Sequence, residues 1–291
     1  MVTIGYYFLQ GISWIFHLIP LRIHYLFSDF LFLLIYHLIR YRRKTVESNL
    51  RNSFPEKSKK ERDHIARNFY HHLCDTFIET LYLTHMSEKE LNKRVTYTGL
   101  DEINAILNQQ KGIIGVVAHY GNWEWMIGLA RKINAKYYVI YKPLHNKAFD
   151  QFFKNSRARF GAVPLDKNKT FRTLISDNQN GIVTFSGFLG DQTPKKNDIQ
   201  YWTKFLNQDT PIFLGAEKIA RKTNMPVVIA HMKKLKRGYY QTEIKVLFEN
   251  PKNTRPFEIT ETHTRFLEKK LIEEPAYWLW SHKRWKHQKE Q

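Results

Sequence analysis

An uncharged amino-terminal end constrains this chain more than any other feature of its sequence. Residues 1–21 contain no Asp, Glu, Lys or Arg, and a second apolar stretch, Tyr25–Ile39, is interrupted only by Asp29. The basic run Arg40-Tyr-Arg-Arg-Lys44 follows directly. The first stretch has nearly the length of a helix that crosses a bilayer, although polar residues interrupt it. Residues 1–44 are therefore predicted to form a helical membrane anchor, spanning or interfacial, with its basic flank on the cytoplasmic side.

Two other interpretations of this end are a signal peptide and a buried helical hairpin. A secretory signal peptide is not expected, because no basic segment precedes the apolar run and no cleavage site of small residues follows it. A buried amphipathic helical hairpin remains an alternative to the anchor. The sequence does not decide between these two.

The composition limits the classes of protein to which the chain can belong. We expect the rest of the chain, residues 45–291, to form one catalytic domain. Apolar residues make up 43% of the 291 residues, which excludes wholesale disorder. The single cysteine, Cys74, excludes a disulfide framework. Lys and Arg outnumber Asp and Glu by 46 to 27, a net charge of +19, so acidic partners are expected. Nucleic acid, anionic lipid and an acidic carrier protein all fit that charge.

From residue 96 onward the hydrophobic pattern alternates between strands and helices. Short apolar runs predict buried strands at 112–118, 137–141, 181–185, 227–230 and 239–248. Helical spacing predicts helices near 122–133, 146–160, 168–179 and 212–223, the last opened by Thr210-Pro211 as cap and first residue. Ser58–Thr84 is predicted as a longer helix. The fold class expected is α/β, a mixed and mostly parallel sheet flanked by helices.

The segment His119-Tyr-Gly-Asn-Trp-Glu124 directly follows the first of these strands. Ligands of α/β sheets gather beyond the carboxyl ends of the strands, so His119 lies where a catalytic loop is expected. A loop that folds back would bring Glu124 to the imidazole, fixing its tautomer and raising its basicity. Such a pair can remove a proton from a hydroxyl as it attacks an acyl carbonyl. A loop histidine with an ordinary structural role is the alternative.

Other chemistries find little support in the sequence. The Gly-x-Ser-x-Gly elbow of serine hydrolases is missing, since Phe185-Ser186-Gly187 lacks the first glycine in frame. Cys74 lies in an apolar helical pattern, which favours a core thiol over a nucleophile. His71, His72 and Asp75 point to different helix faces, so no metal site is expected there. No phosphate-binding loop or dinucleotide fingerprint is present, and no cofactor is expected.

Several blocks of the sequence, in order along nearly the whole chain, resemble the late acyltransferases of lipid A biosynthesis, the lauroyl/myristoyl family. His119-x-x-x-x-Glu124 is similar to the His-x-x-x-x-Asp/Glu motif of glycerolipid-type acyltransferases. The other blocks are Arg42-Arg-Lys with Asn49-Leu-Arg-Asn-Ser-Phe-Pro55, Gly190-Asp191-Gln192, Phe205 to Arg221, and Trp278-x-Trp280-x-His282-Lys-Arg284-Trp285-Lys286. The resemblance implies a glycerolipid-acyltransferase-like fold.

The resemblance also implies an activity: transfer of an acyl chain from the thioester of acyl carrier protein to a hydroxyl of a lipid A precursor, without an acyl-enzyme. In that mechanism His119 is the general base and Glu124 orients it. Arg157 or Arg159 would grip a phosphate or position the donor. Asp191, with Gln192, would bind the acceptor or support the loop around His119.

The implied partners are acyl carrier protein, an anionic glycolipid and the membrane surface, and the implied location is the cytoplasmic face of the inner membrane. Candidate contact patches are Lys195-Lys196, Lys233-Lys234 and Lys236-Arg237. Other glycolipid acceptors, a basic nucleic-acid-binding protein and a non-catalytic membrane scaffold are the competing hypotheses. Against nucleic acid stands the lack of any recognition motif for it.

Overall fold

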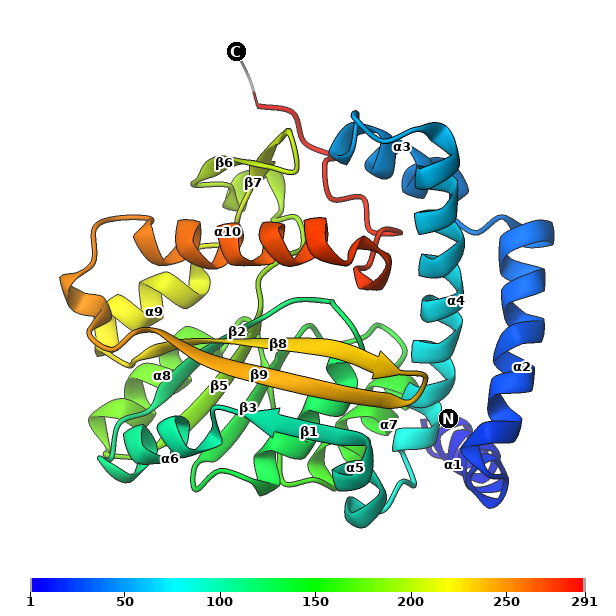
Figure 1. Ribbon diagram of the computed structural model, residues 1–291. Coiled ribbons are helices and arrows are strands. Elements are labelled where there is room, and N and C mark those ends of the chain that lie inside the picture. The colour runs from blue at the N-terminus through cyan, green and yellow to red at the C-terminus, as the bar shows by residue number, and fades with distance from the viewer. Residues whose placement is uncertain (1, 290–291) are drawn as a thin grey trace.

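The computed structural model describes residues 2–289, and Figure 1 shows their arrangement as a sheet with helices on its faces and a helical pair along one side. The helices are α1 (Val2–Leu18), α2 (Leu21–Leu33) with its π-helical extension η1 (Leu34–Ile39), α3 (Arg43–Ser53), α4 (Lys59–Leu83), α5 (Glu88–Arg94), α6 (Leu100–Asn108), η2 (Trp123–Arg131, a 3-10 helix), α7 (Lys147–Ala158), α8 (Thr170–Gln179), η3 (Lys196–Asp198), α9 (Gly215–Thr223), η4 (Pro251–Asn253), α10 (Glu258–Glu273) and η5 (Pro275–Tyr277). The strands are β1 (Val95–Thr98), β2 (Ile113–Val117), β3 (Lys136–Tyr141), β4 (Val163–Asp166), β5 (Thr184–Leu189), β6 (Trp202–Phe205), β7 (Gln208–Pro211), β8 (Val227–Lys236) and β9 (Tyr239–Phe248).

The main sheet has seven strands in the order β1-β9-β8-β2-β5-β3-β4. Every neighbouring pair is parallel except β8 and β9, so the mixed, mostly parallel α/β sheet predicted from the sequence is confirmed. β8 is longer than its apolar run and reaches Lys236. Only Arg237 and Gly238 therefore separate it from β9, and a two-residue connection forces an antiparallel hairpin.

One predicted helix start is wrong. Thr210-Pro211 does not open a helix, because both residues belong to β7, which pairs antiparallel with β6 in a separate two-stranded sheet. Pro211 stands at the end of that strand, where a missing N–H is tolerated. The helix, α9, begins four residues later, at Gly215.

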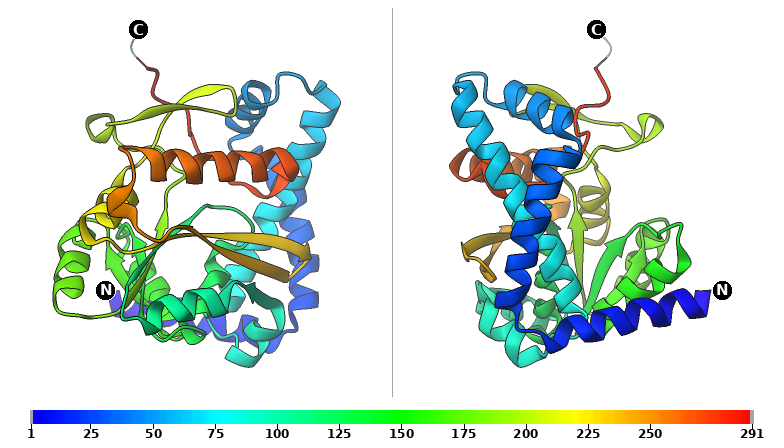
Figure 2. Two further views of the ribbon diagram at one scale, coloured as in Figure 1. Left: turned by 60° about the vertical axis from the view of Figure 1, so that its left-hand side comes forward. Right: turned by 90° about the vertical axis from the view of Figure 1, so that its right-hand side faces the viewer.

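Helix α4 begins and ends close to where the sequence predicts. The hydroxyl of Ser58 accepts a hydrogen bond from the backbone N–H of Glu61, and the Glu61 carboxylate accepts one from the N–H of Ser58. This capping box satisfies two donors that the first helical turn leaves unpaired. Helix α2 packs along α4, and Figure 2 shows α2 on the outer side of the molecule with α1 leading away from its foot.

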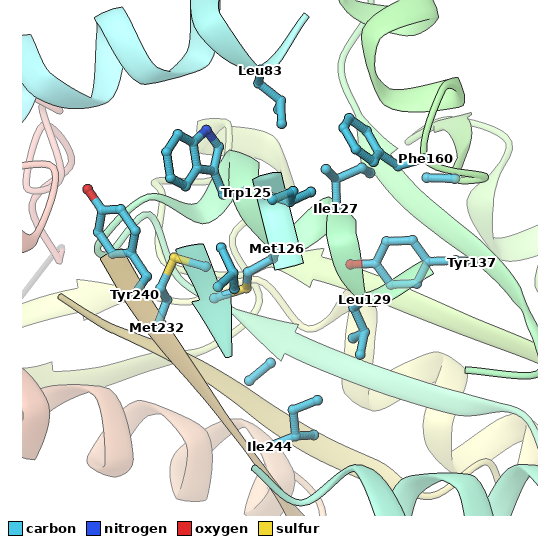
Figure 3. Packing of buried hydrophobic residues seen from close by; sticks show 14 of the residues in the cluster. Leu83, Trp125, Met126, Ile127, Leu129, Tyr137, Phe160, Met232, Tyr240 and Ile244 are labelled. Atoms are coloured by element: carbon cyan, nitrogen blue, oxygen red, sulfur yellow. The ribbon is translucent and has the colours of Figure 1, made fainter. Parts of the chain in front are cut away.

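The largest hydrophobic core lies between the sheet and the segment that follows β2. Trp125, Met126 and Leu129 of η2 belong to it, and Figure 3 shows Trp125 and Met126 near Met232 and Tyr240 of the β8–β9 hairpin and Leu129 near Tyr137. All three side chains are at least 95% buried. Because η2 is anchored by this packing, the loop between β2 and η2 has two fixed ends.

We predict that Gly99→Ala destabilises the fold more than Gly181→Ala. Both glycines have positive φ angles, +83° and +69°, so either substitution adds strain of about 1–2 kcal/mol. At Gly99 the new Cβ would also collide with the backbone carbonyl of Ile244, whereas Gly181 faces open space. Thermal unfolding of both variants checks this, and equal losses of stability would contradict it.

Candidate functional site

The candidate site is the loop between β2 and η2, at the carboxyl edge of the sheet, where His119 follows the strand after one residue. The imidazole Nδ1 lies 2.7 Å from Oδ1 of Asp191, which comes two residues after the parallel neighbour β5. Adjacent parallel strands end at the same edge, which explains why residues 72 positions apart meet there.

Asp191 accepts three hydrogen bonds. Besides the imidazole, its Oδ2 accepts from the backbone N–H of His119 at 2.9 Å and from the indole Nε1 of Trp278 at 2.8 Å. Burial by itself raises the pKa of this carboxyl, but the charge of His119 and these hydrogen bonds outweigh burial and lower the pKa to about 2. Asp191 is therefore an ionised carboxylate at neutral pH, and Nδ1 of His119 carries the proton that it donates.

Nε2 of His119 faces Gln192, whose side-chain nitrogen lies 3.1 Å away. In the tautomer that carries its proton on Nδ1, Nε2 holds the free lone pair, and the Gln192 amide donates to it. The His119 side chain is 13% exposed and that of Asp191 only 3%. The ring thus directs Nδ1 toward the buried carboxylate of Asp191 and Nε2 toward the amide of Gln192.

The loop around His119 is held by the carboxyl-terminal segment. Gly121 N–H donates to the carbonyl of Tyr277 at 3.0 Å, and Leu279 N–H donates to the carbonyl of His119 at 3.2 Å. Gly121 has a φ of +61°, and a Cβ there would lie 2.7 Å from the carbonyl oxygen of Met232. The turn therefore requires glycine at this position.

Helix α4 holds the other side of the same loop through His72. Burial and the nearby charge of Lys234 lower the pKa of His72 to about 3, so its ring is neutral. Its Nε2 lies 3.2 Å from the carbonyl of Gly121, which can only accept, so Nε2–H donates.

Glu79 of α4 is a second support for the loop, and sequence analysis did not single it out. Its side chain is fully buried and accepts hydrogen bonds from Asn122 Nδ2 at 2.6 Å, and from the hydroxyls of Tyr25 and Tyr240 at 2.7 Å each. Its backbone carbonyl accepts from the indole of Trp125. The sequence offers a signal for this role, because Glu79 lies among the regularly spaced apolar residues of the helix. A glutamate at such a position is buried, and a buried carboxylate needs hydrogen-bond donors.

The expectation that Glu124 orients His119 requires correction. The carboxylate on the imidazole is that of Asp191, whereas Glu124 binds Arg157 of α7, with Nη2–Oε1 at 2.8 Å and Nε–Oε2 at 3.2 Å. Asn122 caps η2, and Glu124 lies in the first turn of that 3-10 helix. The loop therefore does not fold back as the sequence argument assumed, and Asp191 supports the loop, one of its two predicted roles.

The two candidate arginines make different contacts. Arg157 pairs with Glu124, and both side chains remain 17–18% exposed. Arg159 donates instead to the backbone carbonyls of Leu83, Thr84 and Met86 at the end of α4. These contacts give Arg159 a structural role and leave Arg157 as the arginine beside the site.

The carboxyl-terminal block Trp278–Lys286 forms the wall behind Asp191. Thr193 N–H donates to Nε2 of His282, and Arg284 is almost fully buried next to a mainly apolar cavity that also borders Asp191. Asn49 Nδ2 donates to the carbonyls of Trp280 and His282, so the block near residue 49 holds this wall. Sequence analysis noted both blocks but assigned them no role.

The other residues considered as nucleophile or metal ligands have structural contacts. Cys74 is buried, and burial raises its pKa to about 12, as expected of a core thiol. His71 stacks on Phe32, while Asp75 pairs with Arg237 and Lys234. Within residues 2–289, no three metal-binding side chains come together.

The geometry defines an α/β protein with a His–Asp pair at the carboxyl edge of its sheet, backed by an aromatic carboxyl-terminal segment. The sequence model of the bacterial lipid A biosynthesis acyltransferases matches residues 1–287, and the chain belongs to this family. The protein is therefore an acyltransferase of lipid A biosynthesis by family. No individual curated protein matches the chain.

We predict that the difference in unfolding free energy between the native protein and the variant Asp191→Asn depends on pH. Asp191 has a pKa of about 2 in the folded protein and about 3.9 in the unfolded chain, so its ionised form stabilises the fold above pH 4. That contribution is lost as the pH falls from 4 to 2. The unfolding free energies of the native protein and Asp191→Asn should therefore converge over this range. A constant difference would contradict the prediction.

We also predict that Glu124 and Arg157 are energetically coupled. Because the pair is bidentate and mostly buried, a cycle of Glu124→Ala, Arg157→Ala and the double variant should give a coupling of about 1 kcal/mol or more in unfolding free energy. The exposed pair Lys204–Asp209 is the matched control, and its coupling should stay below about 0.5 kcal/mol. Additive effects at Glu124 and Arg157 would refute their pairing.

Proposed function

We propose that the protein transfers a fatty acyl chain from the thioester of acyl carrier protein to a hydroxyl of a lipid A precursor, with His119 as the general base. The observation that carries this proposal is the arrangement of His119. Its Nδ1 is bound to a buried carboxylate, while its Nε2 contacts only the side-chain amide of Gln192 among the hydrogen bonds of the described residues. An imidazole held in this tautomer is suited to take a proton at Nε2.

In the proposed reaction the acceptor hydroxyl replaces the Gln192 amide on Nε2. The hydroxyl oxygen attacks the thioester carbonyl as its proton passes to Nε2, and a tetrahedral intermediate forms. The C–S bond then breaks, and the leaving sulfur takes the proton from the imidazolium. The products are the acylated glycolipid and the free thiol of the carrier protein. No bond to the enzyme forms at any step, and no cofactor is required.

The surrounding groups fit this scheme in distinct roles. Asp191 acts as a positioning residue that keeps the proton on Nδ1 and stabilises the imidazolium. The displaced amide of Gln192 is a candidate donor to the oxyanion that develops on the carbonyl. Arg157, held by Glu124, is a candidate contact for a phosphate of the acceptor or for the donor.

A basic rim of exposed lysines next to Gln192 suits an acidic carrier protein. Lys195, Lys283 and Lys286 are all exposed, and Thr193 links their two segments by donating to the carbonyls of Lys283 and Arg284. By contrast, Lys234 and Arg237 of the other predicted patches are engaged with Asp75. We propose that the carrier docks at the rim next to Gln192 and that the enzyme works at the cytoplasmic face of the inner membrane.

The decisive assay uses the purified full-length protein with acyl-loaded carrier protein and a lipid A precursor, and detects the product by mass spectrometry. His119→Ala should lower kcat/KM by about 10²- to 10⁴-fold, because the base is lost. Asp191→Asn should lose less, and His64→Ala, on an exposed face of α4, should stay within twofold. Undiminished transfer by folded His119→Ala would eliminate this base. An acyl chain missing from the glycolipids of cells that lack the protein would identify the acceptor.

A further inference from the structure

One face of α2 is bound firmly to the catalytic domain. Its residues Tyr25 and Ser28 are buried and donate hydrogen bonds to Glu79 and Asp75 of α4. On the neighbouring flank Asp29 pairs with Arg237 at the tip of the β8–β9 hairpin, at 2.6 Å. If α2 moved away, Glu79, Asp75 and Arg237 would each lose one partner.

The opposite face of α2 is apolar and uncovered. It consists of Ile23, Leu26, Phe27, Phe30 and Leu33, which are 50–69% exposed, and it continues into Leu38 and Ile39 of η1. Trp14 and Leu18 of α1, before the other end of α2, are exposed as well. We call these nine residues the apolar face; so large an exposed patch on one helix pair marks an interaction surface.

We propose that the apolar face lies flat on one leaflet of an anionic bilayer, so that α2 runs parallel to the membrane and does not cross it. By length and composition Leu21–Ile39 is the one described helical stretch that qualifies as a span. At about 1.5 Å per residue it is roughly 28 Å long, which fits either orientation, so length alone does not decide.

The packing of α2 against α4 decides the orientation. Figure 1 shows the two helices side by side over most of their length, and the right-hand view of Figure 2 places α2 outermost. A crossing α2 would carry Asp29, near the middle of the stretch, and its partner Arg237 into the hydrocarbon, although their side chains are 46% and 35% exposed. Charged side chains at that depth are costly, and detaching α2 would remove one hydrogen-bond donor from each of the buried carboxyl groups of Glu79 and Asp75.

Charge at the ends of the apolar face favours an anionic membrane surface. Arg22 is exposed at the beginning of α2, and Arg40, Arg42 and Lys44 are exposed just after η1. An interfacial helix with an apolar face and basic ends gains from both hydrophobic burial and attraction to anionic headgroups. The inference rests on the membrane association in the proposed function, but its tests do not measure catalysis.

Cysteine labelling distinguishes the two orientations. Three single variants of the full-length protein, Arg22→Cys, Phe27→Cys and Lys44→Cys, are added to sealed vesicles of phosphatidylcholine with phosphatidylglycerol and treated with a membrane-impermeant maleimide. The native protein is the background control, because Cys74 is buried. A flat helix labels at 22 and 44 from outside, while position 27 is protected by the vesicles. If position 22 or 44 reacts only after the vesicles are made permeable, α2 crosses the bilayer and the proposal fails.

Vesicle binding tests the apolar face itself. Leu26→Asp with Phe30→Asp should weaken partition into these vesicles at least tenfold, whereas Phe171→Asp with Ile272→Asp, equally exposed on α8 and α10, should change it less than twofold. Pure phosphatidylcholine vesicles should bind the native protein more weakly than mixed ones. Equal losses in both double variants, or no binding by the native protein, would overturn the proposal. Circular dichroism verifies that each variant is folded.

Discussion

The structure of the site depends on one buried carboxylate. Asp191 accepts from the ring and the backbone of His119 and from the indole of Trp278, so a single side chain joins β2, the segment after β5 and the carboxyl-terminal end. An ionised carboxylate away from water is stable only when such donors surround it. The same hydrogen bonds that stabilise Asp191 therefore determine where the imidazole points and which of its nitrogens carries the proton.

The carboxyl-terminal segment that binds this carboxylate is itself held by residues from the amino-terminal half of the chain. Asn49 binds the carbonyls of the carboxyl-terminal segment, and Trp278 and Trp280 pack with Phe54 and Phe69 in the second hydrophobic cluster. On the other side, Glu79 receives a hydroxyl from α2 and an amide from the loop after His119. Helix α2 and the loop that follows His119 thus share one buried acceptor, which ties the position of α2 to that of the loop.

Much of the fold followed from periodicity. Buried parallel strands are continuous apolar runs, so β2, β3 and the first part of β8 were predicted, and β9 was predicted with its observed bounds. The strand predicted at 181–185 overlaps β5 only at Thr184 and Phe185. The edge strands β1 and β4 were missed because they are four residues long and partly exposed, which leaves a weak pattern. Thr210-Pro211 is a local signal for a helix start, but here the segment pairs with β6 and forms the strand β7. This pairing is a tertiary contact that the local signal does not contain.

For the site, the sequence by itself determined the histidine, the acidic candidates and the blocks around them, because each is a short local motif next to a strand end. Only the tertiary structure decided that Asp191, and not Glu124, binds the imidazole. The two carboxylates are 67 positions apart in the chain, and which one reaches Nδ1 depends on strand order. Adjacent parallel strands bring residues 119 and 191 to one edge, whereas the 3-10 helix carries Glu124 to Arg157.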